Sequence, residues 1–225
     1  MRTLPTTVLC TCGLAGEARI ARAAGFSTIV GAGDRERTAA LVENAVQRAS
    51  CLVSFGIAGA LAPELRAGDV VISTEVVSET GSWRAEDPFR MRVARLANEI
   101  GALEGAVFGA PEIVASSAEK RRAREATGAL AVDLESDTVA RIATLAGIPF
   151  VVVRAIADPL HRQLPPAALI PLAEDGTPRL SRVLASVLRR PQQVATLFEL
   201  ARETRTALAA LALPARALHG LVAAA

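Results

Sequence analysis

Short runs of β-branched and other apolar residues alternate along the chain with longer stretches in which apolar residues recur every three or four positions. The short runs are typical of buried strands, and the longer stretches are typical of amphipathic helices. Alternation of the two over most of the chain predicts an α/β fold, in which helices cover the faces of a sheet. Neither an internal repeat nor a linker interrupts the pattern.

Glycine and polar turns separate the predicted elements of the N-terminal half. We expect strands over residues 7–12, 27–30, 51–55 and 70–77, a helix over 17–24, a second helix capped by Asp34, and a polar loop through Trp83. Asp87 and Pro88 begin a further helix that ends at Gly101, and Val107 and Phe108 start another extended segment.

A charged helix follows, because Ser116 and Glu119 have the spacing of a capping box. Its basic residues are Lys120, Arg121, Arg122 and Arg124. We interpret this run of charge as a solvent-exposed helix face.

The next segment predicts a β-α-β unit, with a strand reaching 132–135, a helix over 136–146 and a strand over 150–154. Residues 160–178 contain four prolines and form an irregular segment, which either covers a pocket mouth or packs on a neighbouring element. Helices begin at about residue 180 and continue toward the C-terminus. The last of them is marked by Val194, Leu197, Phe198, Ala201, Leu208 and Leu211.

The helix predicted over 180–190 is amphipathic and basic. Its apolar side carries Val183, Leu184, Val187 and Leu188, and its other side carries Arg182, Arg189 and Arg190. Two interpretations stay open: a solvated helix packed on the sheet, or a helix that lies on an anionic membrane.

Composition narrows the class of protein. The 225 residues are 51% hydrophobic and 21% charged, enough for one large core, and we predict a single domain over residues 1–225. The net charge of +2 gives no strongly basic surface, so we expect a small-molecule partner and no nucleic acid. No stretch approaches the roughly 18 uninterrupted apolar residues of a membrane-spanning helix.

Cysteine and histidine usage points to a cytoplasmic protein without a metal. Cys10, Cys12 and Cys51 are odd in number and lack the C-x-x-C spacing, so we expect reduced core thiols. Neither His161 nor His219 lies in a cluster of metal-ligating residues. The N-terminal residues are too polar for a secretory signal.

Three acidic residues lie at or just past the ends of the predicted strands of the β-α-β unit: Asp133 and Glu135 at the strand-to-helix edge, and Asp158 past the second strand. In open α/β sheets, ligands bind beyond the carboxyl ends of the strands, so these acids can face one pocket. The alternative is that Asp133 and Glu135 stabilise the start of the next helix, while Asp158 belongs to a turn.

Four motifs in order carry a family resemblance: FGIAGALAP at 55–63, GDVVIS at 68–73, VDLES at 132–136 and VRAIAD at 153–158. Together they resemble the nucleoside phosphorylase and nucleosidase superfamily over residues 7–160. In these motifs the chain is similar to methylthioadenosine/adenosylhomocysteine nucleosidase. The later segments LPPAAL and LRRP resemble the hopanoid-associated phosphorylase branch, which acts on adenosylhopane.

The resemblance implies a three-layer α/β/α sandwich with a mixed central sheet, in a homo-oligomer. It also implies an enzyme that cleaves the N-glycosidic bond of a 5′-modified adenosine and releases adenine. The expected substrate is adenosylhopane, and the alternative is methylthioadenosine or adenosylhomocysteine. A triterpenoid substrate would favour peripheral contact with the inner face of a membrane. A non-catalytic nucleoside-binding protein is the alternative of another class.

The resemblance also implies roles for individual residues. Asp158 protonates the purine at N7, which requires a neutral carboxyl with a raised pKa. Glu135 holds the ribose hydroxyls, and Leu134 stands where much of the family has a methionine that packs on the ribose. Arg154 either orders the loop of Asp158 or closes its strand in a structural ion pair. Asp133, Ile57, Ala58 and Gly59 complete the expected substrate-binding set.

The nucleophile stays open between water and inorganic phosphate, the one co-substrate to be considered. Glu17 stands near a position where the phosphorylases carry a phosphate-binding arginine, and an acid there would repel phosphate and activate water. The turn 31–33 leads into a helix N-terminus, however, so that Gly33, Arg35 and Arg37 can form an anion site. Ile57 departs from the serine usual in both branches.

Two aromatic residues, Trp83 and Phe89, are candidates for contact with the 5′ substituent, either within one subunit or across a subunit boundary. For Phe89 the default is core packing, and for Trp83 a subunit interface is an equal alternative.

Overall fold

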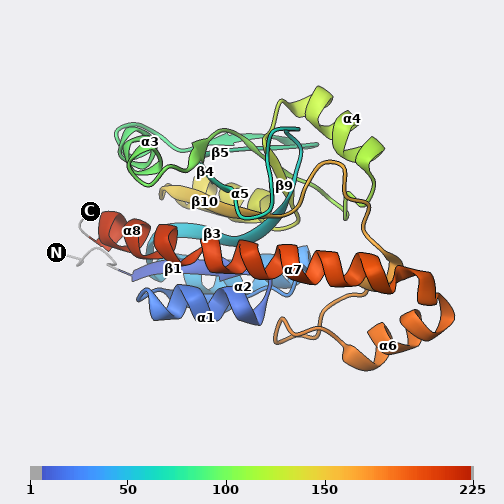
Figure 1. The fold of residues 1–225 in the computed structure, drawn as a ribbon. Helices are drawn as coiled ribbons and strands as arrows, with labels where there is room; N and C mark the ends of the chain where they lie inside the picture. The colour runs from blue at the N-terminus through green and yellow to red at the C-terminus, as the bar shows by residue number, and fades with distance from the viewer. Residues whose placement is uncertain (1–6, 224–225) are drawn as a thin grey trace.

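Ten strands form one mixed sheet at the centre of the molecule, which the computed structural model describes over residues 7–223 (Figure 1). The strands are β1 (Thr7–Cys12), β2 (Ser27–Val30), β3 (Ala49–Ala60), β4 (Val70–Ser73), β5 (Glu75–Ser78), β6 (Gly81–Arg84), β7 (Leu103–Glu104), β8 (Val107–Gly109), β9 (Ala131–Asp133) and β10 (Phe150–Asp158). Most neighbouring strands are parallel, whereas β3–β9, β4–β10 and β5–β6 are antiparallel. The predicted mixed sheet is confirmed.

Helices cover both faces of the sheet. They are α1 (Ala15–Ala23), α2 (Arg35–Ala45), α3 (Phe89–Glu99), α4 (Ser117–Thr127), α5 (Ser136–Ala146), α6 (Leu180–Arg189), α7 (Val194–Ala210) and α8 (Ala212–Ala223). Apolar side chains of α1, α3, α7 and α8 form one core with the sheet, and those of α2 and α5 form a second core. The predicted three-layer α/β/α arrangement is therefore confirmed.

The continuous apolar runs of the sequence follow from this layering. In β1, Val8 and Cys10 belong to one core, and Leu9 between them belongs to the other. Because successive side chains of a strand point to opposite faces, a sheet covered on both sides needs apolar residues at every position. Cys10, Cys12 and Cys51 are free and buried, as expected for core thiols.

The long strand β3 organises the edge at which ligands are expected. It pairs in parallel with β1 and β10, and its end at Gly59 and Ala60 pairs with β9. The register of β10 shifts between Ile156 and Asp158, which places Asp158 opposite Gly59. Because β1, β3 and β10 run in parallel, their carboxyl ends meet at one edge of the sheet. The part of the motif from Phe55 to Ala60 thus lies in β3, which extends beyond the strand predicted over 51–55.

Other elements also differ from the prediction. The strand expected over 70–77 breaks between β4 and β5 because its halves have different neighbours, β10 and β7 for the first and β6 and β8 for the second. The expected polar loop through Trp83 contains β6, which pairs with β5 as a hairpin. The expected closing helix divides into α7 and α8, and Pro214 lies in the first turn of α8, where a missing amide is tolerated.

The C-terminal helices begin with α6, which lies away from the sheet in Figure 1. No residue of α6 is buried, and Leu180, Leu184 and Leu188 are 75%, 59% and 74% exposed. Its contacts are chiefly with the short turns at 166–169 and 191–193, so of the two interpretations left open for this helix, packing on the sheet is not observed. Every helix within residues 7–223 is too short or too polar to span a bilayer.

Candidate active site

A cavity of about 850 Å³ opens at the sheet edge where β1, β3 and β10 end. This volume lies in the upper part of the range of roughly 300–1,000 Å³ that is typical of small-molecule sites. The predicted site residues that line the cavity are Glu17, Gly33, Arg37, Ile57, Ala58, Gly59, Asp133, Leu134, Glu135, Arg154 and Asp158. The cavity therefore brings together residues from both halves of the chain.

Glu17 enters the cavity from the first turn of α1 and is held by backbone amides. Its Oε2 accepts from the amides of Gly13 and Leu14, each at 2.8 Å, and its Oε1 accepts from the amide of Ile57 at 2.8 Å. Burial raises the pKa of this carboxyl, while the bonds from Leu14 and Ile57 lower it. The side chain thus joins the start of α1 to β3, and it is a buried acid with a pKa shifted toward neutrality.

Glu135 lies at the start of α5 and faces the glycine turn. Its Oε1 accepts from the Gly33 amide at 3.0 Å, and Thr38 Oγ1 lies 3.4 Å from the same oxygen. Burial, followed by the negative charge of Glu17, raises the pKa of Glu135 to about 7. The cavity therefore holds two carboxyl groups that disfavour each other's ionisation.

Asp133 and Arg154 form a buried ion pair in the cavity wall. Arg154 Nε lies 2.5 Å from Asp133 Oδ2, and its Nη2 donates to Ser54 Oγ at 2.6 Å. Asp133 Oδ1 accepts from the amides of Glu135 and Ser136, so it satisfies two backbone donors at the start of α5. Two roles were left open for Arg154, and the contact with Asp133 corresponds to the structural ion pair. The hydrogen bonds of Arg154 do not reach the loop that follows Asp158.

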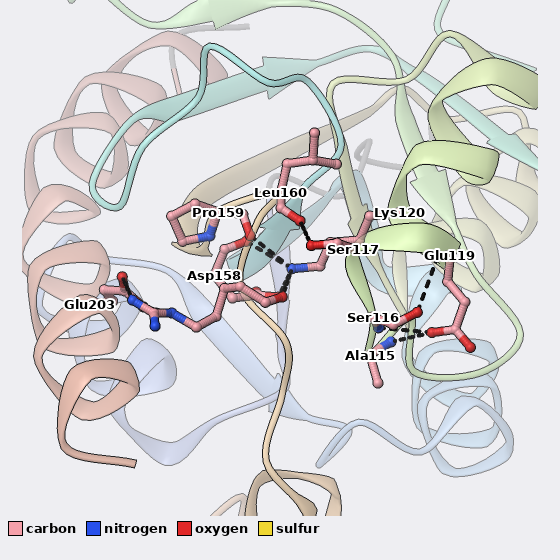
Figure 2. Close-up of polar contacts among 10 residues, drawn as sticks. Ala115, Ser116, Ser117, Glu119, Lys120, Asp158, Pro159, Leu160 and Glu203 are labelled. Carbon is pink, nitrogen blue, oxygen red and sulfur yellow. Dashed lines mark hydrogen bonds and ion pairs between the residues drawn. The ribbon is translucent and has the colours of Figure 1, made fainter. Parts of the chain in front are cut away.

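Asp158 is paired with a residue that the sequence interpretation placed on a solvated face. Lys120 is completely buried, and its Nζ lies 2.5 Å from Asp158 Oδ2 (Figure 2). Burial raises the pKa of Asp158, and the charge and hydrogen bond of Lys120 lower it. The interpretation of Lys120 was wrong because a single lysine turned inward looks, in the sequence, like the exposed Arg121 and Arg122 beside it.

The predicted anion site is divided by the structure. Arg35 does not line the cavity: its Nη2 forms an ion pair with Asp137 at 2.5 Å, and its Nη1 donates to the Ala110 carbonyl. Arg37 lines the cavity, and the Gly33 amide is bonded to Glu135. The glycine turn therefore contacts a carboxylate, and only one of its two arginines reaches the cavity.

Neither Trp83 nor Phe89 lines this cavity. Trp83 Nε1 donates to Asp137 Oδ1 at 2.8 Å, which fastens the β5–β6 hairpin to α5. Phe89 packs, partly buried, between the two cores, as its default interpretation expected. Among the described residues, no group of three or more histidine, cysteine or acidic side chains is placed to hold a metal ion.

The irregular segment 160–178 supplies an apolar wall of the cavity. The residues of this segment that line it are Leu164, Ala168, Leu169, Ile170, Pro171, Leu172 and Glu174. The Gly176 carbonyl accepts from the Ala15 amide at 3.1 Å, so the segment is fastened to the start of α1. Two interpretations were left open for this segment, and its place along the cavity corresponds to the one in which it covers a pocket.

Comparison with known families extends this picture. Residues 8–189 match the family described as the phosphorylase superfamily. The chain belongs to the phosphorylase superfamily. A 5′-methylthioadenosine/S-adenosylhomocysteine nucleosidase of Chromohalobacter salexigens is 31% identical over 128 residues, which are 48% of this chain and 54% of the relative. The match thus spans about half the length of this curated relative.

Solved structures share the fold of this superfamily member. The 5′-methylthioadenosine/S-adenosylhomocysteine nucleosidase of Neisseria meningitidis, in complex with methylthio-immucillin-A, superposes with a TM-score of 0.69 at 18% identity, covering 98% of this chain and 100% of the other. A mutant of the futalosine hydrolase of Helicobacter pylori superposes with a TM-score of 0.60 at 13% identity, covering 88% of this chain and 99% of the other. At these identities the likeness concerns the fold alone.

Proposed function

We propose that this phosphorylase-superfamily protein is an enzyme that cleaves the N-glycosidic bond of a 5′-modified adenosine and releases adenine. The observation that carries the proposal is the convergence of three buried carboxyl groups, those of Glu17, Glu135 and Asp158, on one cavity. Bond cleavage develops positive charge on the ribose and negative charge on the departing base. Carboxyl groups suit both ends, as anions near the ribose and as an acid near the base.

Each carboxyl takes one role in this proposal. Asp158 gives a proton to N7 of the purine, which makes the base a better leaving group. Glu135 binds the ribose hydroxyls and, as an anion, stabilises the oxocarbenium-like sugar. Arg154 and Asp133 hold the start of α5, which carries Glu135.

The nucleophile in our proposal is water, with Glu17 as its base. Two contacts support water over phosphate: the Gly33 amide is taken by Glu135, and Arg35 is paired with Asp137 outside the cavity. A phosphate beside Glu17 and Glu135 would also meet two acids. Arg37, the arginine of this turn that lines the cavity, has its Nη1 3.6 Å from Glu174 Oε2, so it too is paired with an acid.

The substrate that we favour carries a bulky apolar 5′ group, and adenosylhopane, a nucleoside of hopanoid biosynthesis, fits this description. Support comes from the apolar wall formed by Leu164, Leu169 and Ile170, and from a volume in the upper range of small-molecule sites. The second candidate is a methylthioadenosine or adenosylhomocysteine nucleosidase. It is favoured by the 31% identity to the nucleosidase of Chromohalobacter salexigens.

We further propose that α6 rests on an anionic membrane surface, from which an apolar substrate would enter. Exposed leucines of α6 are flanked by the cations Arg179, Arg182, Arg189 and Arg190. A helix with apolar residues and arginines is suited to anionic lipid, and it adjoins the turn 166–169 whose residues reach the cavity wall.

Flotation with vesicles of phosphatidylcholine, with and without phosphatidylserine, tests the contact. We expect binding to the anionic vesicles only, and loss of binding in Leu184→Glu. Leu145→Glu, at a leucine of α5 that is 74% exposed, is the matched control and should bind normally. Absence of vesicle binding would contradict the membrane contact. A dimer in solution that Leu184→Glu dissociates would also contradict it, and would make a second copy the occupant of this face.

The activity itself is tested by adenine release from adenosylhopane and from methylthioadenosine, each with and without phosphate. Chromatography that separates free ribose ends from ribose 1-phosphate ends identifies the nucleophile. We expect release without phosphate, and faster release from the substrate with the larger apolar group. Nucleoside binding without any product would instead indicate a non-catalytic binding protein.

Variants assign the roles. Glu17→Gln and Asp158→Asn should each lower kcat by at least about 100-fold, the usual worth of a general base or acid. Glu64→Gln, at an exposed glutamate, is the control and should leave kcat unchanged. Near-normal phosphate-dependent turnover in Glu17→Gln would overturn the hydrolytic mechanism and make phosphate the nucleophile.

A further inference from the structure

We propose that Lys120 is a positioning residue for Asp158, which orients its carboxyl group and stabilises the carboxylate left after proton donation. The inference rests on the proposed function, in which Asp158 is the acid. It adds Lys120 from α4, a helix none of whose residues lines the cavity.

The contacts of the Lys120 ammonium all lie at the end of β10 and in the short loop that follows it. Besides Asp158 Oδ2 at 2.5 Å, Nζ lies 3.2 Å from the Asp158 carbonyl oxygen, 3.1 Å from that of Pro159 and 3.2 Å from that of Arg162. A buried ammonium is strongly disfavoured unless its protons are bonded and its charge is paired. Here both conditions are met by Asp158 at the end of β10 and by the loop that follows it (Figure 2).

Further bonds fasten the start of α4 to the same loop. Ser117 Oγ donates to the Leu160 carbonyl at 2.8 Å, and the Leu164 amide donates to the Ala115 carbonyl at 2.9 Å. The capping box of Ser116 and Glu119 fixes this end of α4 in turn. The helix thus presents Lys120 to Asp158 as a rigid unit.

The geometry divides the two carboxyl oxygens of Asp158 between two tasks. Oδ2 is held by Lys120, and the group lies against the backbone of Gly59, which also lines the cavity. Oδ1 is left to carry the proton. In the step that we infer, this proton passes to N7 while the C1′–N9 bond breaks and its electron pair moves to the base. Asp158 becomes a carboxylate beside an ammonium that keeps its own protons, and it takes up a proton from solvent after adenine leaves.

The charge of Lys120 therefore makes Asp158 a stronger acid than burial alone would allow. The other charged groups around Asp158 are Glu203 from α7, which is bonded to Arg162, and the Arg154–Asp133 pair on the cavity side. Glu203 raises the pKa of Asp158, and Lys120 is the group that lowers it most. An opposite charge at this distance shifts the pKa of a carboxyl by about 1–3 units.

The test is the pH profile of kcat for Lys120→Met, with Arg121→Met on the exposed face of α4 as the matched control. Asp158 must be protonated to act, so activity is lost as pH rises through its pKa. We expect Lys120→Met to lower kcat at the optimum and to move the alkaline limb upward by at least about one pH unit. A lower kcat with an unmoved limb would show a purely structural lysine and overturn the proposal.

Two further measurements keep the proposal open to refutation. Lys120→Met added to Asp158→Asn should leave the residual kcat unchanged, because the lysine acts through that carboxyl; an additive loss contradicts it. If Lys120→Met does not fold, Lys120→Gln, which keeps a donor without the charge, takes its place.

Failure of the proposed function can be distinguished from failure of the inference on Lys120, because in the first case the wild-type protein would release no adenine. The ion pair is still tested by urea unfolding between pH 4 and 7. Removing Lys120 raises the pKa of Asp158 further, so stability should fall more steeply with rising pH in the variant. Equal slopes in wild type and variant would overturn the inference without reference to activity.

Discussion

At the scale of single residues, glycine determines how closely the acids of the cavity can approach the sheet. Gly56 in β3 lies beside Glu17: a Cβ atom at this position would come within 2.5 Å of Glu17 Oε1 and 2.6 Å of its carboxyl carbon. The Ile57 amide that bonds Glu17 belongs to the next residue. The glycine of this motif therefore makes room for a buried carboxylate, and a larger residue would push it away.

Gly56→Ala is predicted to displace Glu17 from the Ile57 amide. Lost amide bonds leave a buried acid poorly satisfied, at about 1–3 kcal/mol of unfolding free energy. Because Glu17 is the proposed base, kcat should fall by at least about tenfold, while Gly81→Ala, where a Cβ meets nothing within 4 Å, leaves kcat unchanged. Urea unfolding and adenine release check both effects, and a Gly56→Ala protein with normal kcat would remove Glu17 from the mechanism.

At the scale of elements, the segment 160–178 joins the proposed chemistry to the proposed substrate preference. It begins in the loop held by Lys120, continues along the apolar wall, and is fastened at Gly176 to the start of α1, which carries Glu17. The position of this segment therefore depends on residues that also hold Asp158 and Glu17, the two proposed catalytic carboxyl groups. A change that frees this segment should affect substrate binding before it affects the chemical step.

Gly176→Ala tests this dependence. Gly176 has φ of +77°, and a Cβ there would approach the Ala15 nitrogen at 2.7 Å and the Gly13 carbonyl oxygen at 2.8 Å. We expect KM to rise several-fold with a smaller change in kcat, because the apolar wall moves and the acids stay. Gly128→Ala has a similar φ of +67° with no atom near the added Cβ, so it shares the backbone strain without the collision. Equal KM values in the two variants would contradict a role of the segment in binding.

At the scale of the whole molecule, the sequence predicts most of the fold because the apolar periodicity is regular where both faces of the sheet are covered. It misplaces boundaries where pairing decides them: nothing local marks the break at Thr74 or the extension of β3 to Ala60, since both follow from distant strands. The motifs that carry the family resemblance contain Glu135 and Asp158, so the sequence identifies these acids of the cavity. Lys120 and Arg35 escape prediction because the burial of a basic residue is set by its tertiary partner, Asp158 or Asp137.

The buried acids have a consequence for the stability of the whole protein. The pKa values of Glu17, Glu135 and Asp158 are all raised, that of Glu135 to about 7. Between about pH 4.5 and 7 the native state therefore binds more protons than the unfolded chain, and stability falls as pH rises. The lowered pKa values of exposed Glu119 and Asp175 act in the opposite sense, but only below about pH 4.5.

We predict that the free energy of unfolding declines from pH 5 to 7 with a slope of up to about 1.4 kcal/mol per pH unit for each such group. Glu135→Gln cannot ionise and should flatten the decline up to pH 7, whereas Glu64→Gln, at an exposed site, should not. Urea unfolding across this range measures the slopes. Stability that stays level or rises toward pH 7 would mean that the carboxyl groups are ionised in the folded protein, and Asp158 would then lack the proton that its proposed role requires.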